Sequence, residues 1–124
     1  MTYKQISEML ETVGLPYAYY QFPNDTPQSP PFLIFYFENS DDIYADNKNY
    51  QRITEMTIEF YSDTKDFYFE ALIEDTLNAN GLTYTKDEQF LDSEHMHETV
   101  FEMEVLINTD WNLLYPNKFG KKIC

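Results

Sequence analysis

The residues best suited to metal chemistry lie in one short segment, where two histidines flank a methionine. His95 and His97 would place both imidazoles on the same side of an extended chain. Three acidic residues lie close to them in sequence: Asp92, Glu94 and Glu98. A metal site needs ligands that converge on one point, and a His-x-His pair supplies only two of them. A solvated turn before the last strand accounts for the same residues, so we expect no metal site.

Acidic residues elsewhere have the wrong spacing for metal binding or acid–base catalysis. Asp41, Asp42 and Asp46 do not match the twelve-residue calcium loop, which needs a central glycine and a terminal bidentate glutamate. Glu102 and Glu104 would point to the same side of a strand. That position is typical of the solvated side of a sheet, and we do not interpret the two residues as a glycosidase pair.

Motifs for nucleophilic catalysis and phosphate binding are absent from the sequence. The chain has no G-x-S-x-G motif, and its glycines, at positions 14, 81 and 120, are isolated from one another. The single cysteine, Cys124, has no histidine near it in sequence and can form no disulfide within the chain. We therefore expect no catalytic, cofactor-binding or metal-binding residues, and a protein that is not an enzyme.

Two segments alternate between apolar and polar residues, as strands with one buried side do. They are residues 51–61 and 97–108. The side chains predicted to be buried are Met56, Ile58, Phe60, Phe101, Met103 and Val105. The glutamates between them are predicted to face solvent.

Two helices are predicted from their end signals and their apolar periodicity. Residues 3–13 follow a capping-box spacing and stop at Gly14. A second helix near 65–79 would be capped by Ser62, Asp63 or Thr64 and would end at Asn80-Gly81.

The remaining strands complete a single α+β domain over residues 1–110. Strands are predicted at 17–22, at 32–38 and at 82–86 with an extension toward Leu91, and residues 39–49 are predicted to be a polar loop. We expect an antiparallel or mixed sheet of four to five strands, with the two helices packed on one face.

The charge of the chain excludes several classes of partner. A formal net charge of −14, from 22 acidic and 8 basic residues, leaves too few cations to bind a phosphate backbone or an anionic membrane surface. No apolar run approaches the ~18 residues of a membrane span. The first thirteen residues contain Lys4, Glu8 and Glu11 where a signal peptide would be apolar.

Residues 111–124 differ from the rest as a cationic, aromatic C-terminal tail. They contain three lysines and no acid, whereas residues 1–110 contain every acidic residue and five basic ones. One interpretation is a frayed terminus. The other is an arm that docks on the acidic body, its own or a neighbour's, with aromatic side chains as anchors.

The aromatic strands at 17–22 and 32–38 have more large side chains than one small core can hold. The surplus is either ordinary exposed aromatic residues or a patch that another subunit covers. The interface candidates, including those in the tail, are Tyr17, Tyr19, Phe35, Phe37, Trp111, Tyr115 and Phe119.

Several segments together carry a resemblance to a known group of proteins. They are Gly14-Leu15-Pro16-Tyr17-Ala18-Tyr19-Tyr20-Gln21-Phe22, Pro30-Pro31 before an aromatic strand, Ala45-Asp46-Asn47, Ile58-Glu59-Phe60-Tyr61 and Lys65-Asp66. With them, residues 3–108 resemble small virion structural proteins of prophages and long-tailed phages of Gram-positive bacteria. Those proteins act at the head–tail junction and are known as tail-completion, tail-terminator or minor tail proteins.

The resemblance implies a non-enzymatic subunit of a head-tail joining assembly. Terminator-type members are α+β proteins that form rings, often hexamers, on the tail tube. The implied partners are other copies of the chain, tail-tube proteins and head-connector proteins, without a cofactor, a membrane or direct nucleic-acid binding. The implied location is the virion, and the host bacterial cytoplasm during assembly. Acidic walls would keep DNA from adhering as it passes such a ring.

Two alternatives remain open at this point. The acidic composition also suits a phage-encoded DNA mimic that inhibits a host nuclease or restriction system, although acids spread along alternating strands and abundant aromatics do not favour it. An uncharacterised cytosolic binding domain is the third possibility.

Overall fold

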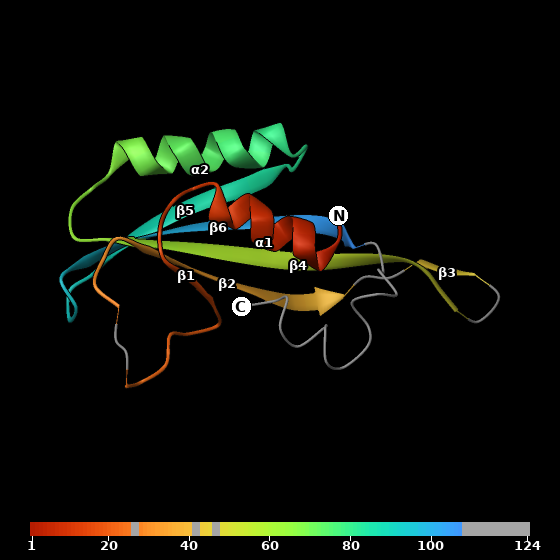
Figure 1. Cartoon of the computed structure of the whole chain (residues 1–124), viewed down its shortest axis with the longest axis horizontal. Helices are drawn as coiled ribbons and strands as arrows, with labels where there is room; N and C mark the ends of the chain where they lie inside the picture. Colours follow the sequence, from red (N-terminus) through yellow and green to blue (C-terminus); the bar gives the residue numbers. More distant parts are fainter. Residues whose placement is uncertain (26–27, 41–42, 46–47, 108–124) are drawn as a thin grey trace.

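The computed structural model describes residues 1–25, 28–40, 43–45 and 48–107, which form two helices and six strands (Figure 1). In chain order the elements are α1 (Tyr3–Glu11), β1 (Tyr17–Tyr19), β2 (Phe32–Ser40), β3 (Ile43–Ala45), β4 (Lys48–Ser62), α2 (Phe67–Ala79), β5 (Tyr84–Leu91) and β6 (Met96–Ile107).

The sheet is mixed, and its long strands are antiparallel. Five strands lie in the order β1-β2-β4-β6-β5, and β3 pairs with β4 alone. The short edge strand β1 runs parallel to β2, while the other pairs are antiparallel. The predicted α+β class is confirmed, with a mixed sheet and two helices.

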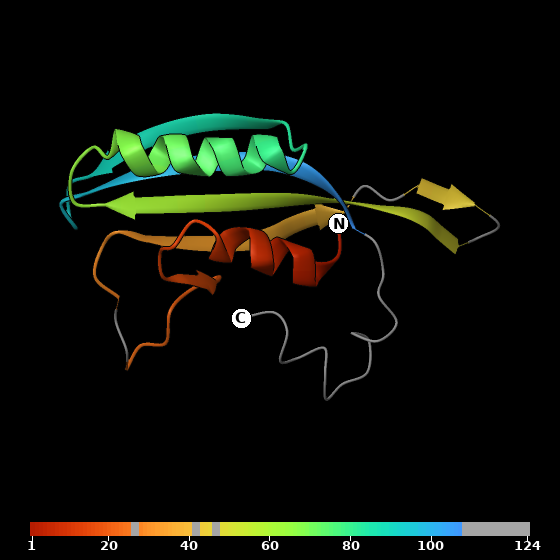
Figure 2. The same ribbon diagram turned by 45° about the horizontal axis from the view of Figure 1, so that its top comes forward.

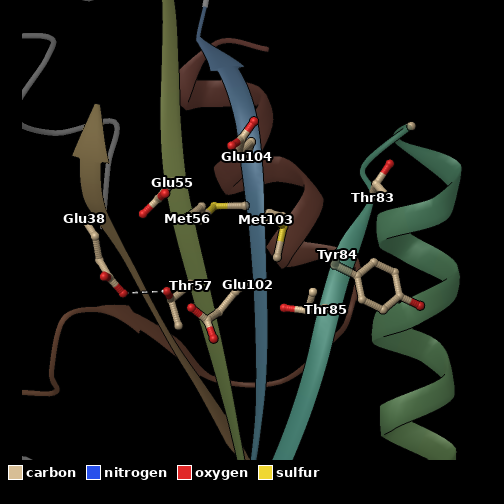
Figure 3. Close-up of a pocket in the computed structure, with 11 residues that line it drawn as sticks. Glu38, Glu55, Met56, Thr57, Thr83, Tyr84, Thr85, Glu102, Met103 and Glu104 are labelled. Atoms are coloured by element: carbon tan, nitrogen blue, oxygen red, sulfur yellow. Dashed lines mark hydrogen bonds between the residues drawn. The ribbon is translucent and has the colours of Figure 1, made fainter. Parts of the chain in front are cut away.

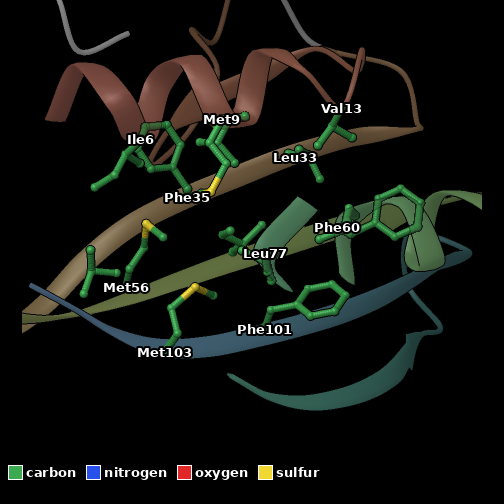
Figure 4. Packing of buried hydrophobic residues seen from close by; sticks show 14 of the residues in the cluster. Ile6, Met9, Val13, Leu33, Phe35, Met56, Phe60, Leu77, Phe101 and Met103 are labelled. Carbon is green, nitrogen blue, oxygen red and sulfur yellow. The ribbon is translucent and has the colours of Figure 1, made fainter. Parts of the chain in front are cut away.

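Both helices pack on the same face of the sheet, which we call the inner face (Figures 1 and 2). The register aligns Phe35, Ile58 and Phe101 in one row across β2, β4 and β6, and each is at most 1 % exposed. Figure 4 shows α1 above this layer, with Ile6 and Met9 directed toward it. All six side chains predicted to be buried from strand alternation are buried.

The helix ends follow capping chemistry, with one correction to the predicted cap. Thr2 caps α1 in a full capping box with Gln5, and Gly14 turns the chain with φ 84°. At α2 the cap is Asp66, whose carboxylate accepts the backbone N–H of Phe69 at 3.0 Å. The prediction of Ser62, Asp63 or Thr64 was wrong because β4 continues to Ser62, which delays the helix start.

The segment predicted as a polar loop, residues 39–49, contains strand structure instead. β2 continues to Ser40, β3 follows, and β4 begins at Lys48. Figures 1 and 2 show β3 and the first part of β4 extending beyond the two helices as a two-stranded arm. Such an arm has no core to bury, so its strands need no apolar alternation, and the polar sequence concealed them.

The strand predicted at 17–22 is shorter in the structure. β1 ends at Tyr19 because Tyr20 has a positive φ of 72°, which turns the chain away from β2.

Candidate interaction surface

The face of the sheet opposite the helices, the outer face, differs in chemistry from the inner face. Alternation along the paired strands places on it the carboxylates Glu38, Glu55, Glu59, Asp87, Glu98, Glu102 and Glu104. The same alternation places Phe32, Ile34, Tyr36, Tyr61, Val100 and Leu106 among them. None of the outer-face side chains that the structure describes on these strands is lysine or arginine.

Tyrosine hydroxyls and carboxylates form a hydrogen-bonded chain across the outer face. Tyr36 donates to one oxygen of Glu59 at 3.1 Å, and the Tyr61 hydroxyl lies 2.9 Å from the other. The Tyr61 oxygen also lies 2.7 Å from Glu98, which accepts a further bond from Gln89. Tyr61 has one hydroxyl hydrogen, so it donates to only one of its two carboxylates at a time.

These contacts hold both hydroxyls in their neutral form. Burial, followed by the charge of Glu59, raises the pKa of Tyr36 to about 12. Burial and the bonds to Glu98 and Glu59 raise the pKa of Tyr61 further still. Both side chains therefore stay neutral hydrogen-bond donors even at pH values near 10, where an ordinary tyrosine begins to ionise.

Aromatic rings continue this network toward the turn after β1. Phe32 stacks on Tyr61 with 5.0 Å between ring centroids, and Phe22 meets Phe32 edge-on at 5.3 Å. Tyr20, 70 % exposed, lies 5.6 Å from Tyr36 by ring centroids. One end of the outer face is thus aromatic and tightly packed.

A trough of about 570 Å³ occupies the other part of the outer face (Figure 3). Its rim includes Glu38, Glu55, Glu102 and Glu104, on three neighbouring strands. Thr57 lies between them, 3 % exposed, and donates to Glu38 at 2.9 Å. The trough therefore offers carboxylate oxygens from three neighbouring strands.

A second charged cluster lies on the inner side, where α2 crosses β5. Glu70 is 2 % exposed and is paired with Lys65 at 2.8 Å and with Lys86 at 2.9 Å. Lys65 also pairs with Glu88, and Lys86 with Glu74. Burial alone would raise the pKa of Glu70, but hydrogen bonds from the two lysines outweigh it and lower that pKa. The ion pairs of this cluster hold α2 against the edge strand β5, and its charged groups are therefore already paired within the molecule.

The two histidines are not arranged alike. His95 is an exposed turn residue with φ 52°, and His97 lies in β6 with its ring 5.0 Å from that of Phe90. Across the described part of the chain, no three His, Cys, Asp or Glu side chains are grouped to hold a metal ion. Asp41, Asp42 and Asp46 lie outside the described residues.

The predicted interface residues separate into three groups. Tyr17, Tyr19 and Phe37 are half-buried and pack against the core from the inner face. Phe35 is 1 % exposed, so its proposal as an interface residue is wrong: the alternation of β2 directs it under α1. The tail candidates Trp111, Tyr115 and Phe119 lie outside the described residues.

Besides Tyr20, three aromatic side chains of the described residues are strongly exposed, and none of them was predicted as an interface residue. Phe67 and Tyr68 open α2 with 73 % and 72 % exposure, and Phe90 is 47 % exposed. Lys65 lies over the ring of Phe67 at 5.1 Å. Helical periodicity could have predicted this exposure. Phe67 and Tyr68 precede the apolar stripe that begins at Phe69, and they therefore lie off the buried side of the helix.

Within the residues described, neither helix is both long enough and apolar enough to span a membrane. No model of a known protein family matches the sequence, and no curated protein matches it. The functional interpretation therefore rests on the residues and on their arrangement.

Proposed function

We propose that this protein is a virion structural subunit of a long-tailed phage, which acts without catalysis at the head–tail junction as a tail-completion or tail-terminator ring component. The sequence resemblance over residues 3–108 supplies the phage assignment. The α+β fold of the domain is the one that this resemblance implies.

The two-stranded arm is the observation that carries the role as an assembly subunit. A two-stranded hairpin is marginally stable in water on its own, and it gains stability from packing against further structure. Figures 1 and 2 show the arm extending beyond the helices that cover the rest of the sheet. A neighbouring subunit would supply that packing.

A ring also needs two different surfaces on each subunit, because its contacts are heterologous. The exposed pair Phe67 and Tyr68 follows the C-terminal end of β4, whereas the arm contains its N-terminal end. β4 has 15 residues, and at ~3.3 Å per residue the two ends lie ~45 Å apart. We therefore expect the aromatic pair of one subunit to contact the arm of the next, head to tail.

The acidic composition of the protein, with a formal net charge of −14, supports a position near DNA without contact to it. Its carboxylates would repel a phosphate backbone, which suits the wall of a channel through which DNA must move. Acidic walls of this kind require no base or phosphate recognition.

The decisive experiment removes the gene from the phage that encodes it and examines the particles by electron microscopy. We expect filled heads without attached tails, or tails of irregular length, and restoration by the wild-type protein supplied in trans. Normal virions from the deletion phage would refute the proposal.

A matched pair of variants tests the contact surface. Phe67→Ser with Tyr68→Ser should fail to restore tailed particles, because it removes the exposed aromatic pair without touching the core. Asp75→Asn, an exposed change on the same helix, should restore them as well as the wild type does. Equal restoration by both would exclude α2 from the interface.

The gathering of carboxylates on one face favours a second candidate, an acidic DNA mimic. Such a protein would inhibit a host nuclease or restriction enzyme in vitro at stoichiometric concentration, and a phage lacking it would still build normal virions. The same deletion phage therefore separates the two proposals.

A further inference from the structure

We propose that the outer face of the sheet is a docking surface for the chain's own C-terminal segment, residues 111–124. The inference concerns folding within one molecule and does not depend on a role in phage assembly.

The outer face combines apolar and anionic groups in a way that suits a cationic, aromatic occupant. Leu106 is 53 % exposed although it stands in a long central-sheet strand, and Val100 and Tyr36 are half-buried on the same side. Carboxylates flank them, and those of Glu102 and Glu104 are exposed. Neither α1 nor α2 crosses this face (Figures 1 and 2).

The composition of the segment is complementary to that surface. Its charged side chains are three lysines, with no acid, and its large apolar side chains include Trp111, Leu113, Leu114, Tyr115 and Phe119. The described outer face has seven carboxylates and no cation on its paired strands. Exposed ion pairs are weak singly and are screened by salt, so the aromatic residues would anchor the segment and the lysines would orient it.

β6, which precedes the segment in the chain, ends close to the rim of the trough. β6 ends at Ile107, and Leu106 and Glu104 just before it both face outward. Neighbouring strands are ~4.8 Å apart, so a path from β6 to β2 crosses only ~10 Å, whereas fourteen extended residues reach ~45 Å. The segment can therefore cover the trough after a short reversal of direction.

Tethering selects the chain's own segment over that of a neighbour. A segment joined by a few residues to its site experiences an effective concentration on the order of millimolar. At micromolar protein concentration, the same segment on another molecule competes poorly for the trough.

Trp111 is the only tryptophan, so its fluorescence reports docking directly in the full-length protein. We expect blue-shifted emission and several-fold weaker acrylamide quenching than in a synthetic peptide of residues 111–124. Both properties should be independent of protein concentration over about two decades in the micromolar range, as an intramolecular contact requires.

Variants of the surface should release the tryptophan. Glu102→Gln with Glu104→Gln, and separately Leu106→Ser, should increase quenching toward the value of the peptide, with unchanged far-ultraviolet circular dichroism. The matched control is Glu8→Gln with Glu11→Gln, which removes two exposed carboxylates from α1 and its end and should leave quenching unchanged. Added salt should also increase the quenching of the wild type, but by less than the double substitution Glu102→Gln with Glu104→Gln does.

A nitroxide on Cys124, the only cysteine, provides a measurement that needs no substitution. It should broaden the amide signals of outer-face strand residues such as Thr57 more than those of α1. Quenching equal to that of the free peptide would overturn the proposal and identify a frayed end. Quenching protection that appears only at high concentration, or broadening between labelled and unlabelled molecules, would overturn it in favour of exchange between copies.

Discussion

The inner and outer faces of the same sheet are built from alternate residues of the same strands, yet they follow different rules. On the inner face Ile58 and its row neighbours are fully buried under two helices. On the outer face Thr57 is also buried, at 3 %, but by neighbouring polar and aromatic side chains and through a hydrogen bond to Glu38. One face is closed by apolar packing, whereas the other is held by hydrogen bonds and keeps carboxylates exposed to solvent.

The difference shows which face determines the fold and which face is available for interaction. Burial of apolar surface stabilises the folded state by about 25 cal/mol per Å². Because a shift of one residue would turn the apolar side chains away from the core, the inner face determines the strand register. Hydrogen bonds between exposed or half-buried groups contribute less net stability, since water competes for them. Substitutions on the two faces should therefore differ in size and in their dependence on pH.

The largest effect is expected on the inner face. Ile58→Ala should lower the free energy of unfolding by about 2–5 kcal/mol, because it leaves a cavity beneath both helices. The measurement is the midpoint of denaturant unfolding at an unchanged slope. Glu102→Ala, on the outer side of the paired strand, is the control and should change stability by less than about 0.5 kcal/mol. If both variants lost a similar amount of unfolding free energy, the inner face would not be the one that determines stability.

The next effect concerns the charged cluster at the edge of the inner face. Glu70→Ala leaves Lys65 and Lys86 close together without their shared carboxylate, and should cost about 1–3 kcal/mol, less than a fully buried pair because both lysines are partly exposed. Asp75→Ala on the exposed side of the same helix should be nearly neutral.

The stability difference between the wild type and Glu70→Ala should depend on pH, and the direction of the Glu70 pKa shift gives the sign of that dependence. The pKa of Glu70 is lowered in the folded state, so its contribution is present above the ordinary glutamate pKa of 4.5 and is lost as pH falls through the folded value. The difference in unfolding free energy between the wild type and Glu70→Ala, measured by urea titration, should therefore become smaller as the pH is lowered. A gap that stayed constant to pH 2–3 would show that Glu70 acts by packing and not by charge.

Sequence predicted the inner face well because apolar alternation is a strong signal where one side of a strand is buried. Residues 51–61 and 97–108 gave the correct register, and the six predicted core side chains are all buried. The arm was missed because strands without a core carry no such pattern. Asp66 was missed as the cap because residues 62–66 contain four side chains able to cap a helix, and only the length of β4 decides among them.

The candidate surface was harder to predict, since it depends on which strands are neighbours. Tyr36, Glu59 and Tyr61 lie on two strands, and Glu98 lies on a third, far along the chain. Their pairing follows from strand order, which composition does not give. Phe35 illustrates the same limit, because a shift of one residue along a strand moves an aromatic side chain from the buried face of the sheet to the other face.

A smaller effect is expected from the outer-face network. Tyr61→Phe keeps the stacking on Phe32 but removes the hydroxyl placed between two carboxylates, and should cost about 0.5–1.5 kcal/mol in thermal or denaturant unfolding. Tyr68→Phe, which alters an exposed hydroxyl at the start of α2, should be neutral. Equal values for both would mean that the network on the outer face adds no stability beyond what solvent provides.

The smallest effect is a loss of stability at alkaline pH to which the outer face contributes through Tyr36. The pKa of Tyr36 is raised from 10.0 to about 12, so the folded state holds its proton more tightly than the unfolded chain does. The contribution of this group is therefore complete below pH 10 and is lost as the pH rises toward 12. Tyr36→Phe should flatten the decline in unfolding free energy over this interval, whereas Tyr20→Phe, its exposed ring neighbour, should not. An ultraviolet titration of tyrosinate absorbance, compared between wild type and Tyr36→Phe, locates the ionisation directly. If the wild type and Tyr36→Phe lost stability in parallel from pH 10 to 12, the carboxylates of the outer face would not be close enough to Tyr36 to hold its proton.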